Sequence, residues 1–114
     1  MPMDGSLDYI ELPGPDIPAT KTFYSTVFGW RFTDYGPEYV AFEAQGRNGG
    51  FNATLKVVES GGPLVVLYAK KLDEMEAKAK AAGAEIIGHE TFTGGRRFHF
   101  RDPNGNHLAV WTRT

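Results

Sequence analysis

Short runs of alternating hydrophobic and polar residues follow one another along the chain, separated by two stretches with helical spacing. Residues 7–12, LDYIEL, alternate with period two and predict a strand. A helix is expected next, with Asp16 as its N-cap, Pro18 in its first turn and Gly29 at its end. Three strands are predicted from WRFTDY, EYVAFEA and GFNATLKVV, and the segment QGRNGG before the last of them predicts a flexible hairpin or lid.

The same order of elements returns after residues 59–63, ESGGP, which have the composition of a linker. LVVLYA predicts a strand that is apolar on both faces, as is typical of a central strand. LDEMEAKAKAAG predicts a helix with two ion pairs at i,i+4 spacing, Glu74–Lys78 and Glu76–Lys80. AEIIGHETF, RRFHFR and HLAVWT predict three further strands.

The repeated order indicates an internal duplication, because the two predicted helices open at Ile17 and Leu72, about fifty-five residues apart. We therefore expect an α+β fold of two βαβββ units. Unit one covers about residues 7–58 and unit two about residues 63–114, within a single domain over residues 1–114.

The last two strands are joined by Asp102-Pro103-Asn104-Gly105, a sequence that favours a three-residue hairpin with a glycine bulge. This turn pairs Phe100 with Leu108 and Phe98 with Val110, so that one face of the hairpin is apolar and should pack under the helices. The opposite face carries the remaining side chains: Arg97, His99, Arg101, His107, Ala109 and Trp111. By the same alternation, Ile10 and Leu12 should lie under the first helix and Tyr9 and Glu11 on the opposite face.

Composition excludes several classes of function. The chain has 114 residues, a net charge of -2 and no cysteine. The absence of a basic excess argues against nucleic-acid binding and against an anionic membrane surface, and no apolar run is long enough to span a bilayer. Disulfides, thiolate metal sites and cysteine nucleophiles are excluded. No signal peptide is visible, and we expect a cytoplasmic protein.

Three segments resemble the vicinal oxygen chelate superfamily, which includes glyoxalase I, bleomycin-resistance proteins and extradiol dioxygenases. They are YIELPGPDIPATKTFYSTVFGWRF, LDEMEAKAKAAGAEI and FRDPNGNHLAVW, and together they cover nearly the whole chain. The resemblance implies that two βαβββ units form a curved, cup-like mixed sheet with the helices on its outer face. It also implies a ligand or metal on the concave face, and a homodimer.

Metal-binding members of that superfamily carry His, Gln or Glu ligands on the first and last strands of each unit. Carried over by position, these ligands correspond to Tyr9, Leu64 and Ala109, with Asn52 or Thr54 as the nearest fourth position. Leu64 and Ala109 have no donor atom, and Tyr9 is a poor ligand for the usual ions. We therefore expect no metal cofactor. The alternative is one divalent ion at a relocated site, formed by His99 and His107, with His89 if it joins them, together with Glu11.

The predicted ligand-binding residues share the helix-free face: Tyr9, Glu11, Tyr68, Arg97, His99 and Trp111. The aromatic side chains suit stacking against a planar ligand, although packing within the cup or at a dimer interface explains them equally well. Glu11 could serve as a general base, but pairing with Arg97 or another cation is the favoured interpretation. Arg101, close to the turn, is expected to be solvated. No catalytic residue can be assigned.

These observations favour a metal-free small-molecule-binding protein of the glyoxalase/bleomycin-resistance type. The ligand is small and organic, and the sequence leaves its charge open because Glu11 and Arg97 would select opposite charges. The alternative is a lyase, isomerase or dioxygenase that uses a relocated metal. A non-catalytic interaction module is a third possibility, because one fold hosts many functions.

Overall fold

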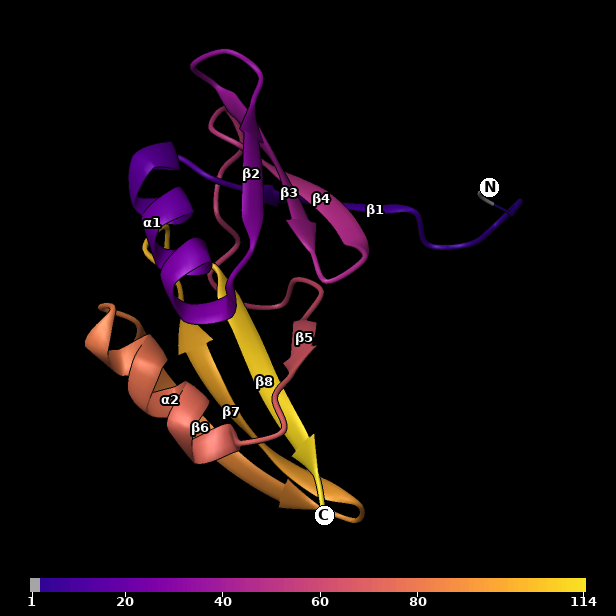
Figure 1. Cartoon of the computed structure of the whole chain (residues 1–114), viewed down its shortest axis with the longest axis vertical. Helices are drawn as coiled ribbons and strands as arrows, with labels where there is room; N and C mark the ends of the chain where they lie inside the picture. The colour runs from indigo at the N-terminus through magenta and orange to yellow at the C-terminus, as the bar shows by residue number, and fades with distance from the viewer. Residues whose placement is uncertain (1–2) are drawn as a thin grey trace. The chain divides into compact units, whose positions relative to one another are not determined.

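Strand, helix and three strands follow one another twice in the computed structural model, which describes residues 3–114. The chain divides into two units, one ending at Lys56 and the other beginning at Val57. The elements of unit one are β1 (Tyr9–Pro13), α1 (Ile17–Phe28), β2 (Arg31–Asp34), β3 (Tyr39–Ala44) and β4 (Arg47–Asn52). Those of unit two are β5 (Val65–Tyr68), α2 (Leu72–Ala81), β6 (Glu85–Phe92), β7 (Gly95–Arg101) and β8 (His107–Arg113). Figure 1 shows both units, and the predicted α+β class with two βαβββ units is confirmed.

Each unit contains one mixed four-stranded sheet, and the two sheets have the same strand order. The orders are β1-β4-β3-β2 and β5-β8-β7-β6, with the first strand parallel to the last in each unit. The prediction that LVVLYA is a central strand is therefore wrong, because β5 lies at the edge of its sheet. Its side chains Val66 and Tyr68 are 42% and 46% exposed.

Helix α1 begins and ends where the capping residues predict. The side chain of Asp16 accepts a hydrogen bond from the backbone N–H of Ala19 at 3.1 Å, and Gly29 adopts the left-handed conformation, with φ of 74°. Buried aromatic side chains connect α1 to its sheet. Trp30 stacks between Tyr24 and Phe42, with ring centroids 4.5 Å and 4.4 Å away.

Unit two confirms the predicted hairpin. Residues Phe98, Phe100, Leu108 and Val110 are fully buried, and Phe100 pairs with Leu108 as expected. In the turn, the backbone N–H of Asp102 donates to the carbonyl of Asn106 at 3.0 Å, and Gly105 has a φ of 96°. The turn residues thus set the register of β7 against β8, and with it the two faces of the sheet.

Three local predictions are corrected. QGRNGG does form a hairpin turn, between β3 and β4, but the turn is confined to Gln45 and Gly46 because β4 begins at Arg47. The segment after Asn52 is not a strand. Ile10 faces the helix side as predicted but remains 40% exposed, because β1 lies at the edge of the sheet and α1 packs over β2 and β3.

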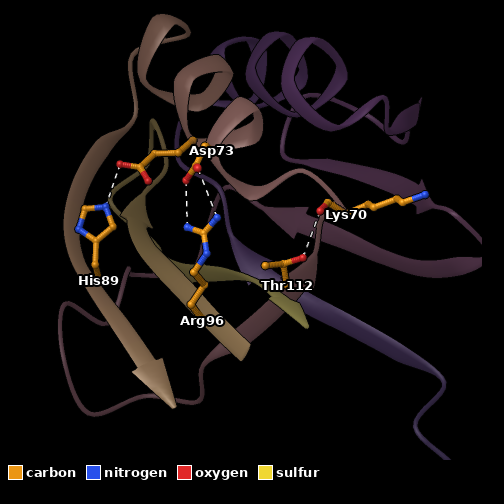
Figure 2. Close-up of polar contacts among 6 residues, drawn as sticks. Lys70, Asp73, His89, Arg96 and Thr112 are labelled. Atoms are coloured by element: carbon orange, nitrogen blue, oxygen red, sulfur yellow. Dashed lines mark hydrogen bonds and ion pairs between the residues drawn. The ribbon is translucent and has the colours of Figure 1, made fainter. Parts of the chain in front are cut away.

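Polar contacts attach α2 to the sheet of unit two (Figure 2). Arg96 on β7 donates to both carboxylate oxygens of Asp73, at 2.9 Å and 3.3 Å, and His89 on β6 lies 2.9 Å from the carboxylate of Glu76. His89 therefore lies on the helix side, and the suggestion that it joins the opposite face is wrong. A bulge between Ile86 and Gly88 shifts the alternation of β6 and explains the error.

The predicted i,i+4 pairs on α2 are also replaced. Glu76 pairs with His89, and Glu74 pairs with Lys71 at 3.7 Å. Within residues 3–114, neither helix has the length and apolar character that a membrane crossing requires.

Candidate functional site

The face of each sheet opposite its helix, here called the open face, carries the predicted site residues. In unit two, cross-strand pairing sets four large side chains in one row: Tyr68 pairs with Trp111, Trp111 with Arg97, and Arg97 with Glu90. The next row contains Val66, Ala109 and His99. Strand pairing alone therefore brings four of the six predicted residues together: Tyr68, Arg97, His99 and Trp111.

Three aromatic side chains form one end of this face. The ring of Tyr68 meets Trp111 edge-on, with centroids 5.4 Å apart, and Phe92 lies 6.4 Å from Trp111. The guanidinium of Arg113 lies over both rings, 5.3 Å from the centroid of Tyr68 and 5.4 Å from that of Trp111. At this end of the open face, partly exposed aromatic rings therefore contact the guanidinium of Arg113 through cation–π interactions.

A chain of polar contacts runs from the aromatic end toward the β7–β8 turn. The Nε of Arg97 donates to Oε1 of Glu90 at 2.8 Å, and Nε2 of His99 contacts the same oxygen. The Nδ1 of His99 lies 2.8 Å from Nε2 of His107. The side chain of His99 is 13% exposed, less than those of Arg97 and Glu90, which are 28% and 50% exposed. Glu90, His99 and His107 are therefore connected through hydrogen bonds.

The contacts among these side chains shift the pKa values of Glu90 and His107. Hydrogen bonds from His99 and Arg97 hold the pKa of Glu90 below its usual range, so that its carboxylate is ionised at neutral pH. The pKa of His107 is lowered first by burial and then by the nearby His99, Arg101 and Arg97. His107 is therefore neutral at neutral pH.

Arg101 is not a solvated surface residue as predicted. Its guanidinium donates to the carbonyl of Gly105 at 3.1 Å and to that of Glu59 at 3.1 Å, and the residue is half-buried. These bonds fix its positive charge beside His107, its partner across β7 and β8.

The open face of unit one carries a second polar cluster. The hydroxyls of Tyr9 and Tyr39 lie 2.5 Å apart, and Nδ2 of Asn52 donates to Glu11 at 3.3 Å. Burial raises the pKa of Tyr39, and hydrogen bonds with Tyr9 and Glu11 add to the effect. The cluster requires Gly50, because a Cβ there would lie 2.1 Å from the hydroxyl of Tyr39.

A cavity of about 260 Å³ lies beside this cluster, within unit one. Side chains of the open face that line it include Tyr9, Arg31, Thr33, Glu43 and Asn48. Its lining combines the aromatic rings of Tyr9 and Phe42 with hydroxyl, amide and charged groups, which is the mixture that orients a small polar ligand.

Of the six predicted residues, two belong to unit one, Tyr9 and Glu11, and four to unit two, Tyr68, Arg97, His99 and Trp111. Within unit one, Glu11 accepts a hydrogen bond from Asn52, and within unit two Arg97 donates one to Glu90.

Sequence reasoning missed Glu90, Tyr39 and Arg113. Glu90 was not assigned to the open face, because the bulge in β6 reverses the alternation of side chains between the two faces of the sheet. The alternation of EYVAFEA alone would have indicated the face of Tyr39.

The residues at the superfamily's metal positions do not fit a metal ion. The hydroxyl of Tyr9 is engaged by Tyr39, and Leu64 and Ala109 carry no donor. Residues 3–114 contain no group of three or more His, Asp or Glu side chains arranged to hold a metal. Both ring nitrogens of His99 are already hydrogen-bonded, to Glu90 and to His107.

Comparison with known proteins agrees with the resemblance described from the sequence. The model of the Glyoxalase/Bleomycin resistance protein/Dioxygenase superfamily matches residues 6–110. No curated protein matches the chain significantly.

Among solved structures, the fosfomycin resistance protein FosX from Listeria monocytogenes, complexed with Mn(II) and sulfate, has a TM-score of 0.85 at 19% identity, over 98% of this chain and 93% of that one. An integron cassette protein from V. cholerae has a TM-score of 0.73 at 23% identity, covering 100% and 99%. A glyoxalase-related enzyme from Fulvimarina pelagi has a TM-score of 0.78 at 19% identity, covering 96% and 88%. At these identities the structural likeness supports a shared fold alone.

Proposed function

Since the chain belongs to the Glyoxalase/Bleomycin resistance protein/Dioxygenase superfamily, we propose that it is a small-molecule-binding protein of the glyoxalase/bleomycin-resistance type. The observation that carries the proposal is the open face of unit two. There, Tyr68 and Phe92 remain partly exposed beside Trp111, Arg97 and His99. A solvated sheet face seldom gathers three large aromatic side chains, whereas ligand sites commonly combine them with a few polar groups.

The proposed ligand is planar or amphipathic and carries an acidic group. Arg97, Arg101 and Arg113 lie on the open face of unit two, where Glu85 and Glu90 supply the opposing charges. Because the arginines outnumber the glutamates, the face favours an anion over a cation. The two histidines, His99 and His107, add hydrogen-bonding groups. The aromatic end would stack against the planar part, with Arg113 moving aside or covering it.

The proposal includes the absence of the superfamily's metal chelate, which is supported by Leu64 and Ala109 at two of its positions. The alternative, a metal-dependent lyase, isomerase or dioxygenase, requires one divalent ion per chain. Metal analysis of protein purified without added metal separates the two. We expect no stoichiometric divalent ion and an unchanged melting temperature in chelator, and one bound zinc, iron or nickel per chain would favour the alternative.

The ligand itself is tested by tryptophan fluorescence. Planar aromatic acids and antibiotics are screened against the wild type and against Trp111→Ala, in which the remaining Trp30 is buried in unit one and serves as the internal control. We expect compounds that quench the wild type, lose their effect in Trp111→Ala and bind at least about tenfold more weakly to Tyr68→Ala, a loss of about 1.4 kcal/mol. A response that survives removal of Trp111 would contradict this site.

A homodimer and a cytoplasmic location complete the proposal. The dimer is supported by the exposed apolar residues of the edge strands β1 and β5. The location is supported by the absence of cysteine from the sequence.

A further inference from the structure

The contacts of Glu90 determine where the proton of His99 lies. An ionised carboxylate can only accept hydrogen bonds, and Glu90 is held ionised by His99 and Arg97. The contact between Oε1 of Glu90 and Nε2 of His99 therefore requires a hydrogen on Nε2. In neutral His99, the other nitrogen, Nδ1, is then a bare acceptor.

The tautomer of His107 follows from that of His99. Because Nδ1 of His99 and Nε2 of His107 are 2.8 Å apart, one hydrogen lies between them. When both rings are neutral, His107 donates it from Nε2, and its outer nitrogen, Nδ1, is left with a free lone pair. In the described part of the chain, no protein group hydrogen-bonds to this outer nitrogen.

The pair has room for one additional proton. Two protonated rings would direct two N–H groups at each other across 2.8 Å, which excludes double protonation in this geometry. A single added proton places its charge on His99, beside the carboxylate of Glu90. His107 is disfavoured as the charged partner, because it is half-buried and faces the cations Arg97 and Arg101.

We infer that Glu90, His99 and His107 form a proton relay on the open face of unit two, with Nδ1 of His107 accepting a proton from a bound weak acid. The proton leaves an O–H or N–H group of the ligand and bonds to Nδ1 of His107. The hydrogen on Nε2 of His107 passes to Nδ1 of His99, which becomes an imidazolium still bonded to Glu90. The ligand becomes an anion, and the total charge is conserved.

The surroundings favour this direction of transfer. Arg101 lies opposite His107 on β7 and Arg97 beside His99, so that both guanidinium groups stabilise the anion that forms. Glu85 lies opposite Arg101 on β6, and β5, which pairs with β8 on its other side, carries one titratable side chain, Tyr68. The inferred ligand class, which rests on the proposed function, is a small molecule with a phenolic, enolic or imide-type acidic group.

Histidine tautomers are measured by NMR of protein labelled with ¹⁵N and ¹³C in histidine, without any ligand. At alkaline pH we expect both His99 and His107 to carry hydrogen on Nε2. On acidification His99 should become the imidazolium, while His107 stays neutral and its hydrogen shifts to Nδ1. Independent titration of the two rings, or an imidazolium at His107 with neutral His99, would overturn the relay.

Matched variants separate the relay from general effects of charge. Glu90→Gln removes the carboxylate, so we expect the pH midpoint of proton uptake by the pair to fall and the fixed Nε2–H tautomer of His99 to be lost. Glu76→Gln removes the corresponding partner of His89 on the helix side and should change the spectrum of His89 alone. An unchanged His99–His107 titration in Glu90→Gln would refute the assignment.

Proton transfer from a ligand is tested with 4-nitrophenol, whose phenolate is yellow, and with 4-nitroanisole, which has no acidic proton. We expect the wild type to increase the phenolate fraction at a pH below the phenol's own pKa, and His107→Phe to lose this increase. An equal phenolate fraction in both proteins would overturn the proton-accepting role. Success of the NMR test together with failure of the fluorescence screen would reject the proposed function and leave the relay standing.

Discussion

Gly50 shows how one residue determines what the open face of unit one can hold. Its missing side chain leaves the space in which the hydroxyls of Tyr9 and Tyr39 meet, since a Cβ would lie 2.6 Å from the first and 2.1 Å from the second. The pKa of Tyr39 is raised first by burial and then by its contacts with Tyr9 and Glu11. The pH at which Tyr39 ionises therefore reports on the intact cluster.

We predict that Gly50→Ala separates the two hydroxyls and lets Tyr39 ionise at lower pH. The added methyl group meets the ends of flexible side chains, so that the stability cost should be about 1–3 kcal/mol. Absorbance titration of tyrosine and urea unfolding measure the two effects. Gly88→Ala is the matched control, because a Cβ at Gly88 meets nothing within 4 Å. An unchanged tyrosine titration in Gly50→Ala would contradict the cluster.

The face on which a residue lies could be predicted from sequence where a turn anchors the strand register. His99 and Trp111 were placed on the correct face of the sheet, because the turn at residues 102–105 sets the register of both strands. Glu90 was missed because the extra residue in β6 carries no sequence signal as clear as that of a turn. The partners of a residue are less predictable than its face, as the contact of Arg97 with Glu90 shows.

Among the elements, the β7–β8 hairpin carries the core of unit two. Phe100 is fully buried, whereas Phe92 on the neighbouring strand is 42% exposed on the open face. We predict that Phe100→Ala lowers the free energy of unfolding by about 3–5 kcal/mol, and Phe92→Ala by about 1 kcal/mol or less. Urea denaturation provides both values. Similar losses in the two variants would mean that the faces of the sheet have been assigned incorrectly.

The attachment of α2 depends on pH through Asp73. Its pKa is lowered by the hydrogen bonds and charge of Arg96, so Asp73 stays ionised to a lower pH in the folded protein than in the unfolded chain. The stabilisation is therefore present above the unfolded pKa of about 3.9 and is lost as the pH falls through the lower folded pKa.

We predict that Asp73→Asn lowers the melting temperature at pH 7, and that the difference from the wild type shrinks below about pH 4. Thermal melts followed by circular dichroism across this range measure it. Glu74→Gln on the same helix is the control, because Glu74 has one long contact with Lys71, at 3.7 Å, whereas Asp73 accepts two hydrogen bonds from Arg96. A difference that grows in acid would contradict the role of Asp73.

Element types and order were predictable because capping and turn residues mark their boundaries. Asp16, Gly29 and the turn at residues 102–105 all lie where the local chemistry requires. Strand position within a sheet was not predictable for β5, because apolar residues on both faces indicate burial without identifying what covers them. A strand at an edge and a strand at the centre can share such a sequence.

At the scale of the whole molecule, both edge strands carry exposed apolar residues. Ile10 on β1 and Val66 on β5 are 40% and 42% exposed, and both strands end their sheets. An exposed strand edge with apolar side chains favours association with another chain. The superfamily resemblance noted from the sequence leads to the same expectation, a homodimer.

The dimer is tested by comparing two leucine-sized residues of equal exposure in unit one. Light scattering at micromolar concentration should give twice the mass of the chain. Ile10→Lys places a charge on the edge strand β1, and we expect it to weaken dimerisation at least about tenfold, because a buried unpaired charge opposes association. Leu55→Lys alters a residue that is also 40% exposed but lies outside the strands, and should leave the mass unchanged. A monomeric wild type would refute the dimer, and equal effects of the two variants would place the interface away from β1.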